Sequence, residues 1–385
     1  MATHPQAKLS LTDAVYIGVG SMIGAGLFAA FAPATAAAGN WLLLSLALAA
    51  FLAFANATSS AQLAAQYPES GGTYIYGNRQ LGHIWGFAAG WCFVIGKTAS
   101  CAAMALTFAA YLAPGYEKPL AIAAVAALTT VNYRGITRTA ALTKILVTVV
   151  LLALAVFFGA VLLGVAPEPS LATMGAEVRD PARTIPRAII IALTLVGSLY
   201  VLVALALIHQ LGYEGLADAS APLAAAVGSS APLAALMGLA ASIGALGALL
   251  ALITGIGRTG QAMASNRDLP TYFAHLHPVY AVPYRLEITV AVAVTALILL
   301  FDVRGAIGFS SFGVLLYYCV ANLAAFTQTA PYRRYPRTLQ VAGAVGCCLV
   351  VGTLPPASIA GGLVLLGVGL AVYLLYDRPT QTEKP

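Results

Sequence analysis

The stretch Gly18-Val19-Gly20-Ser21-Met22-Ile23-Gly24-Ala25-Gly26-Leu27-Phe28 interrupts the first long apolar segment of the chain, which runs from about residue 11 to 38. Each of its four glycines costs about 1 kcal/mol relative to alanine inside a helix, so the run predicts a break in a membrane-spanning helix. Two half-helices that meet at a break expose carbonyls on one side and N–H groups on the other, which suits a ligand carrying both a carboxylate and a cation. The alternative is close helix packing through small residues four apart, here Gly20 and Gly24.

The composition of the chain is that of a membrane protein. Of its 385 residues, 60% are hydrophobic and only 8% are charged, and the mean hydropathy is +0.88. A soluble domain carries about 25% charged residues, so we expect an all-α polytopic membrane protein. The five cysteines lie in apolar runs without the spacing of metal ligands, and no catalytic or nucleotide-binding motif is present. The sequence therefore predicts no enzyme activity, no metal, no cofactor and no nucleic-acid partner.

Eleven segments are apolar enough to cross a bilayer, which takes about 20 residues. The connecting loops are short, which predicts one transmembrane domain over residues 1–385. The expected spans are 12–38, 41–66, 83–113, 119–132, 141–165, 188–210, 231–257, 286–301, 306–328, 338–354 and 356–376.

The positions of the basic residues disagree with eleven crossings. With the amino terminus in the cytoplasm, eleven spans place 12 basic residues outside and 6 inside, the reverse of the usual bias. One further crossing before Arg179 gives 16 inside and 2 outside, with the intramembrane Lys97 left out of the count. Residues 143–176 are too few for two full spans, and Pro167 and Pro169 break a helix there. The charges thus call for a crossing that the sequence barely contains.

Five landmarks give the chain a family resemblance. The glycine stretch, followed by Pro33, resembles the first-helix motif of amino acid permeases of the amino acid–polyamine–organocation (APC) superfamily. The resemblance continues, in the family's order, at Tyr67-Pro-Glu-Ser-Gly-Gly-Thr-Tyr74, Asn132-Tyr-Arg-Gly135, 177–186 and 258–283. It implies a LeuT-like inverted-repeat bundle, with 12 spans in the family and about 11 here. The first repeat would cover about 12–165, a shortened second repeat about 170–328, and two terminal spans about 338–376.

The resemblance also indicates which helix is missing and which residues bind the substrate. The family builds its substrate site from the hinges of helices one and six, and most of helix six is expected to be absent here after Val165. What remains of the site by resemblance is the helix-one hinge, whose backbone would hold the substrate α-carboxylate. The hinge residues are Ser21, Met22, Ile23, Gly24, Ala25 and Gly26.

Two lysines are the candidate charged groups inside the spans. Lys97 lies near the middle of span 83–113, where an ionisable residue costs at least about 2.5 kcal/mol and is a functional candidate by default. It could bind the substrate carboxylate, or its long stem could carry the charge to the interface. Lys144 matches a helix-five lysine of proton-coupled relatives and is a candidate coupling residue, or else a topology-setting charge. Asp13, Glu287 and Asp302 fall at span ends, which argues against a carboxylate proton relay. Tyr111 falls near a span end and is expected in the interfacial aromatic belt.

These observations favour a secondary amino acid permease, proton-coupled or exchanging, that uses an amino acid substrate and a proton or exchanged solute. We expect a multi-pass protein of the cell membrane, embedded in its lipid bilayer with a cytoplasmic amino terminus. The rival hypothesis is a truncated homologue without transport activity that acts as a membrane partner or has no activity. A membrane-embedded enzyme would need a catalytic cluster that the spans do not offer.

Overall fold

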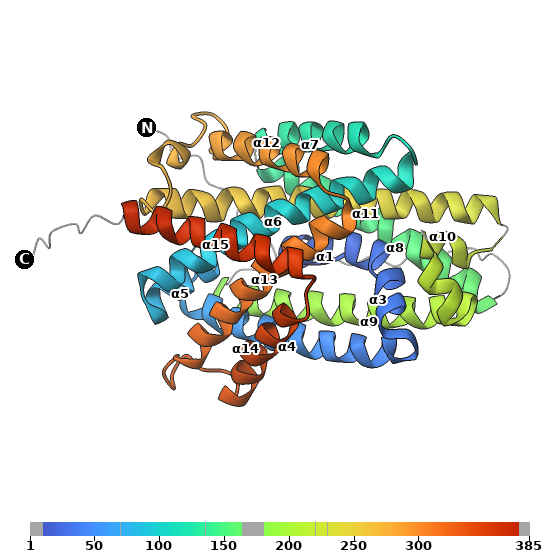
Figure 1. Cartoon of the computed structure of the whole chain (residues 1–385), viewed down its shortest axis with the longest axis horizontal. Coiled ribbons are helices and arrows are strands. Elements are labelled where there is room, and N and C mark those ends of the chain that lie inside the picture. The colour runs from blue at the N-terminus through green and yellow to red at the C-terminus, as the bar shows by residue number, and fades with distance from the viewer. Residues whose placement is uncertain are drawn as a thin grey trace, which may run out of the picture.

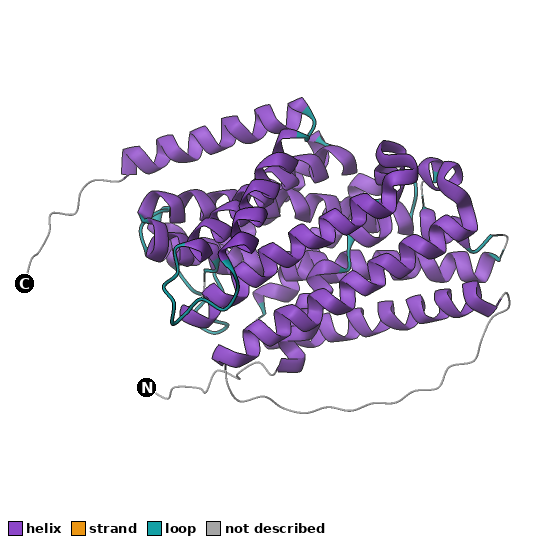
Figure 2. Ribbon diagram, turned by 90° about the horizontal axis from the view of Figure 1, so that it is seen from below, coloured by secondary structure: helices purple, strands orange, loops and turns teal. Residues whose placement is uncertain are grey.

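The protein folds into a bundle of long helices. The computed structural model describes residues 11–69, 71–134, 136–163, 181–219, 221–228 and 230–376, and within these ranges it contains helices and loops but no strand. Several of the longest helices run along the long axis of the bundle, and short loops join most of them (Figures 1 and 2). Seven helical stretches of the described chain are long and apolar enough to cross a membrane. The all-α, polytopic prediction is confirmed.

Each of the eleven predicted spans is helical. The first divides into α1 (Leu11–Met22), α2 (Ala25–Ala29) and α3 (Phe31–Ala38), as its glycines predict. The other ten are α4 (Leu42–Gln66), α6 (His83–Leu112), α7 (Glu117–Tyr133), α8 (Ile136–Leu163), α9 (Pro181–Asp218), α11 (Ala231–Ser265), α12 (Tyr284–Leu300), α13 (Val303–Phe326), α14 (Arg337–Gly352) and α15 (Pro356–Tyr376). Short helices lie between them: η1 (Gly39–Trp41), α5 (Thr73–Leu81), α10 (Pro222–Ala226) and η2 (Thr271–Ala274).

The core lies where α6 and α11 pack against their neighbours. α6 packs against both α13 and α11, and α11 also packs against α8. Small residues allow this close approach: a Cβ added at Gly96 of α6 would lie 3.1 Å from the Ser310 carbonyl oxygen of α13. In lipid, where the hydrophobic effect does not drive helices together, such contacts and buried hydrogen bonds hold a bundle. The small-residue packing proposed as an alternative to the break is therefore present together with it.

Helices α8 and α9 run in the same direction, although they follow each other in the sequence. Along α1, Gly18 lies against Ala192 of α9, and farther on Met22 contacts Tyr200. Gly20 likewise lies against Thr143 and Val147 of α8, and farther along both helices Phe28 and Val150 lie against Gly244 of α11, so α8 runs in the direction of α1 too. Consequently α8 ends and α9 begins on opposite sides of the bundle. The extra crossing demanded by the basic residues is consistent with this polarity, and it falls at 164–180, outside the described residues.

Candidate functional site

The break in the first span is centred on Gly24. Helix α1 ends at Met22, the backbone of Gly24 is extended (φ −157°, ψ −141°), and α2 begins at the next residue. The N–H groups of Leu27 and Phe28 both donate to the Gly24 carbonyl oxygen, at 3.0 and 3.3 Å, which starts the new helix. An extended backbone does not itself require glycine, but the packing does. A Cβ added at Gly24 would lie 2.8 Å from both the Ala248 Cβ and the Met104 Sδ.

Two tyrosine hydroxyls bind carbonyl oxygens on either side of this break. Tyr200 of α9 donates to the Met22 carbonyl oxygen at 3.2 Å, and Tyr111 of α6 donates to the Phe28 carbonyl oxygen at 2.7 Å. A carbonyl at a helix end needs such a partner in the bundle interior, because water is not there to supply one. The Tyr111 ring also packs edge-on against Phe28, with centroids 6.4 Å apart. Tyr111 thus points into the bundle and not into an interfacial aromatic belt, contrary to the expectation from its place in the sequence.

The predicted hinge residues gather at the break, but with different exposures. Ile23 and Gly24 are buried, Met22 and Gly26 are half-buried, and Ser21 is exposed. The Ser21 hydroxyl donates to the Gly18 carbonyl oxygen of its own helix at 2.8 Å. Ala25 is the first residue of α2. The hinge therefore offers chiefly backbone groups as ligands, together with the two tyrosine hydroxyls.

The two predicted lysines lie on the amino-terminal side of the break. Lys97 is half-buried on α6, seven residues before Met104, so both lie on one face of that helix about 10.5 Å apart along its axis. Among the described residues, no hydrogen bond or ion pair is made by its ammonium group. Lys144 is half-buried on the turn of α8 that packs against Gly20. The fold brings both lysines to the side of the bundle where α1 begins but places neither in contact with Gly24.

A polar network that the sequence analysis missed ties four segments together at one end of the bundle. His83 Nε2 lies 2.7 Å from the Asp268 carboxylate, whose other oxygen accepts a 2.6 Å hydrogen bond from the Tyr74 hydroxyl. Asn266 Nδ2 donates to the Tyr74 oxygen at 2.9 Å, and the Tyr373 hydroxyl lies 2.9 Å from His83 Nδ1. Burial and the adjacent Asp268 carboxylate raise the pKa of Tyr74 above its usual range, so this hydroxyl stays neutral and donates. The network joins α5, α6, the 266–268 loop and α15.

One carboxyl group contradicts the expectation that no acid enters the spans. Glu287 does stand near the start of α12, as its position predicted, but it is only 2% exposed and points between helices. Its Oε1 accepts a 2.8 Å hydrogen bond from Asn132 Nδ2 of α7. The place of Glu287 along α12 does not predict its burial, because α7 and α11 pack against this end of the helix and cover the side chain. The argument against a carboxylate proton relay therefore fails.

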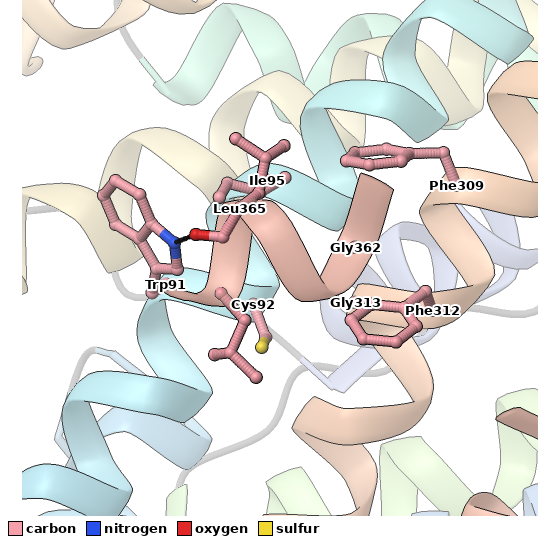
Figure 3. Close-up of a pocket in the computed structure, with 9 residues that line it drawn as sticks. Trp91, Cys92, Ile95, Phe309, Phe312, Gly313, Gly362 and Leu365 are labelled. Atoms are coloured by element: carbon pink, nitrogen blue, oxygen red, sulfur yellow. Dashed lines mark hydrogen bonds between the residues drawn. The ribbon is translucent and has the colours of Figure 1, made fainter. Parts of the chain in front are cut away.

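A small apolar pocket lies apart from the break, between α6, α13 and α15 (Figure 3). Its lining includes Phe309, Phe312 and the backbone of Gly362, and the Trp91 indole N–H at its edge already donates to the Leu365 carbonyl oxygen at 2.8 Å. A lining without a free polar group has nothing with which to orient a polar ligand. We therefore place the candidate site at the break.

The chain matches a known family along most of its length. The sequence model of the family described as amino acid permease matches residues 9–176 and, in a second segment, residues 157–382. The two matches overlap in the region where the basic residues and the polarity of α8 and α9 call for an additional crossing.

Curated relatives cover nearly the whole chain. An uncharacterized transporter of Mycobacterium tuberculosis (strain ATCC 25618 / H37Rv) is 48% identical over 411 aligned positions, which cover 98% of this chain and 93% of the relative. Since 98% of 385 residues is about 377, about 34 aligned positions have no counterpart in this chain. A serine/threonine exchanger of Bacillus subtilis (strain 168) is 25% identical, covering 95% of this chain and 96% of the relative. A branched-chain amino acid permease of the same organism is 21% identical, covering 96% and 93%.

Proposed function

The chain belongs to the amino acid permease family of membrane transporters, and we propose that it carries amino acids by secondary active transport, driven by a proton gradient or by exchange. It is a transporter and not an enzyme, and its family implies the LeuT-like fold. The observation that carries the proposal is the break at Gly24, where backbone groups face the bundle interior beside two tyrosine hydroxyls.

In the proposed site, the substrate uses the backbone at the break. Its α-carboxylate binds the N–H groups of Gly24, Ala25 and Gly26, because a restarting helix directs N–H groups and a partial positive charge at its ligand. Its α-ammonium group competes with the tyrosine hydroxyls for the carbonyl oxygens of Met22 and Phe28. Ser21 and Met22, at the end of α1, and Ile23 directly after it face the substrate. The tyrosines then act as internal substitutes for the substrate when the site is empty.

The lysines supply positive charge in this proposal. Lys97 attracts the substrate carboxylate as it passes the side of the bundle where α1 begins. Lys144 is the proposed coupling residue, since it lies on the turn of α8 that packs against Gly20 and so shares a contact with α1.

A second candidate function is a truncated homologue that does not transport. It is favoured by one observation: α8 and α9 are parallel, so Leu163 at the end of α8 and Pro181 at the start of α9 lie on opposite sides of the bundle. The 17 residues available would span about 26 Å as a helix, less than the hydrocarbon core of about 30 Å. The parallel course of α8 and α9, together with the 34 or so aligned positions of the mycobacterial relative that have no counterpart here, supports the inference that most of helix six is absent.

Uptake by purified protein in liposomes tests the proposal. The panel of labelled amino acids includes serine, threonine, leucine, isoleucine and valine, with and without an inward proton gradient and with and without unlabelled amino acid inside. A matched variant carries a family-like sixth helix inserted after Val165. Saturable uptake by the natural chain supports transport by the short form. Uptake by the inserted variant alone refutes transport by the natural chain and supports the truncated alternative.

We propose a cell-membrane location with the amino terminus in the cytoplasm. The proposal follows from the 16 basic residues that this orientation, with the extra crossing, places on the inner side. Cysteines introduced in the exposed loops at Glu69 and Gly115, in a variant lacking the natural cysteines, test it in intact cells. An impermeant thiol reagent should label the position at Gly115 and not the position at Glu69. The opposite labelling would reverse the orientation.

A further inference from the structure

The carboxyl group of Glu287 lies among three helices without a cation to neutralise it. Oε1 accepts one hydrogen bond from a neutral amide, Asn132 Nδ2, and Oε2 is buried with no hydrogen-bond partner in the described chain. Among the described residues, no Lys, Arg or His nitrogen lies within 4.0 Å of either oxygen. An ionised carboxylate buried in this way is costly unless it is paired. A proton on the carboxyl group removes this charge.

The surroundings of Glu287 can serve the charged and the neutral acid alike. α7 and α12 lie side by side (Figure 1), and across their contact Asn132 offers an amide that can donate through Nδ2 or accept through Oδ1. Thr254 of α11 places its hydroxyl 3.0 Å from both Asn132 Oδ1 and the Leu250 carbonyl oxygen. With Thr254 donating to Asn132, the amide donates to the carboxylate. With Thr254 donating to Leu250, a rotated amide accepts a proton carried on Oε1 of the neutral acid, the oxygen that faces Asn132.

Other polar and charged groups near this cluster leave the carboxyl group as the site of titration. Thr129 lies three residues before Asn132 on the same face of α7. Its hydroxyl oxygen, like Oε2 of Glu287, is buried without a hydrogen-bond partner in the described chain. Arg258 follows Gly257, whose added Cβ would lie 3.3 Å from Oε1, but Arg258 itself is exposed. The remaining titratable or charged groups on the packed elements are Glu117, Lys118 and Tyr133 of α7 with Arg134 directly after it, His83, Cys92, Lys97, Cys101 and Tyr111 of α6, Tyr272, His275, His277 and Tyr280 in and after η2, and Tyr284 and Arg285 of α12.

Helix α11 connects this cluster to the break in the first span. Thr254 lies on the same helix as Ala248, which packs against Gly24, and the six steps from one to the other correspond to about 9 Å along the helix axis. The same helix places Gly244 3.6 Å, measured from its added Cβ, from the Ile23 carbonyl oxygen. Thr254, whose hydrogen bond would change with the protonation of Glu287, therefore lies on the same helix, α11, that forms one wall of the break.

We propose that Glu287 is the proton-binding site of this transporter, with Asn132 and Thr254 as positioning residues that support both of its protonation states. The proposal rests on the proposed transport function and names the group that carries the driving proton. One proton binds to Oε1, the oxygen within hydrogen-bond distance of Asn132, and leaves from it; the hydrogen bonds of Asn132 and Thr254 reverse with it, and no other covalent bond changes.

The first test separates proton coupling from substrate movement. Glu287→Gln keeps the shape of the side chain without its titration, and Glu117→Gln, at an acid in the first turn of α7 whose carboxylate accepts a hydrogen bond from the Gly115 N–H, is the matched control. For one-proton coupling, an inward gradient of one pH unit should give about tenfold accumulation by the natural protein and the control. Glu287→Gln should give no accumulation while still exchanging labelled for unlabelled amino acid. Equal loss of exchange and accumulation, or accumulation that remains, would overturn the proposal.

A second measurement works even if no transport is found. Infrared spectra of the purified protein across a pH series should contain a carboxylic acid band that titrates in the natural protein and is missing in Glu287→Gln. Asn132→Leu should shift the midpoint of this titration to higher pH, because leucine cannot donate to the charged form. If no protein takes up amino acids, the transport function fails and the infrared titration alone decides on Glu287. Identical titrations of the natural protein and Glu287→Gln would refute the site.

Discussion

The Tyr200 hydroxyl of α9 lies 3.2 Å from the Met22 carbonyl oxygen, at the point where α1 ends. The same hydroxyl contacts the position that a Cβ on Gly26 would occupy. Helix α9 thus covers one side of the break and presents one polar group to it. Because α9 runs parallel to α1, Tyr200 lies at the height of the break. If helix six is absent, as we infer, Tyr200 supplies a hydrogen bond to the break from a neighbouring helix.

Adding a methyl group at the break should damage both packing and transport. Gly24→Ala places a Cβ 2.8 Å from the Ala248 Cβ, a fixed atom of α11, so one of the helices must shift. Overpacking of this kind costs about 1–3 kcal/mol, and we expect a lower melting temperature in detergent and little uptake. Gly197→Ala, on α9, has no atom within 4 Å of the added Cβ and should behave as the natural protein. A normal melting temperature and normal uptake for Gly24→Ala would contradict the packing described here.

The two tyrosine hydroxyls should have separable effects on binding. Tyr200→Phe and Tyr111→Phe each leave a carbonyl oxygen of the break without its donor, at a cost of about 1–3 kcal/mol. If the substrate ammonium replaces these donors, the empty protein is destabilised more than the loaded one. Stabilisation by a transported amino acid, measured as the rise in melting temperature, should therefore be larger in the variants. An unchanged or smaller rise would show that the tyrosines do not compete with the substrate.

Replacing Lys97 should affect apparent affinity more than maximal rate. Lys97→Leu removes the positive charge on the path to the break, and we expect KM for uptake to rise several-fold. Lys97→Arg keeps the charge and should stay within about twofold of the natural KM, a difference of about 0.4 kcal/mol. Lys118→Leu, at an exposed lysine, is the control. Equal KM values for Lys97→Leu and the natural protein would leave Lys97 without a role in attracting the substrate.

The network around Asp268 should contribute to stability. Tyr74→Phe removes the hydroxyl that donates to the Asp268 carboxylate at 2.6 Å, and the side chain of Asp268 is only 3% exposed. Leaving this acceptor with one donor fewer should cost about 1–3 kcal/mol, seen as a lower melting temperature near neutral pH. Tyr116→Phe, at a residue that is 72% exposed, should leave the melting temperature unchanged. If the two variants melt alike, the hydrogen bond does not stabilise the fold.

Much of the architecture could be predicted from the sequence, because it depends on local properties. Apolar runs of sufficient length must become helices in lipid, and the glycine run had to weaken one of them. All eleven predicted segments are helical over their described residues, seven helical stretches are long and apolar enough to cross a membrane, and the break lies where the glycines predict it. The distribution of basic residues also indicated an additional crossing, since charge bias can be read without knowing any contact.

The contacts across the bundle were not predictable in the same way. Tyr111 and Glu287 were assigned from their distance to a span end, but burial depends on which neighbouring helices extend past that end. Tyr200 meets Met22, 178 positions earlier in the sequence, only because α9 lies against α1. The amino acid sequence by itself determined a polytopic helical bundle with a broken first span, since both follow from the solvation of apolar and backbone groups. Tertiary structure alone decided which hydroxyls bind the break and which carboxyl group is buried, because hydrogen bonds and desolvation depend on distances between helices.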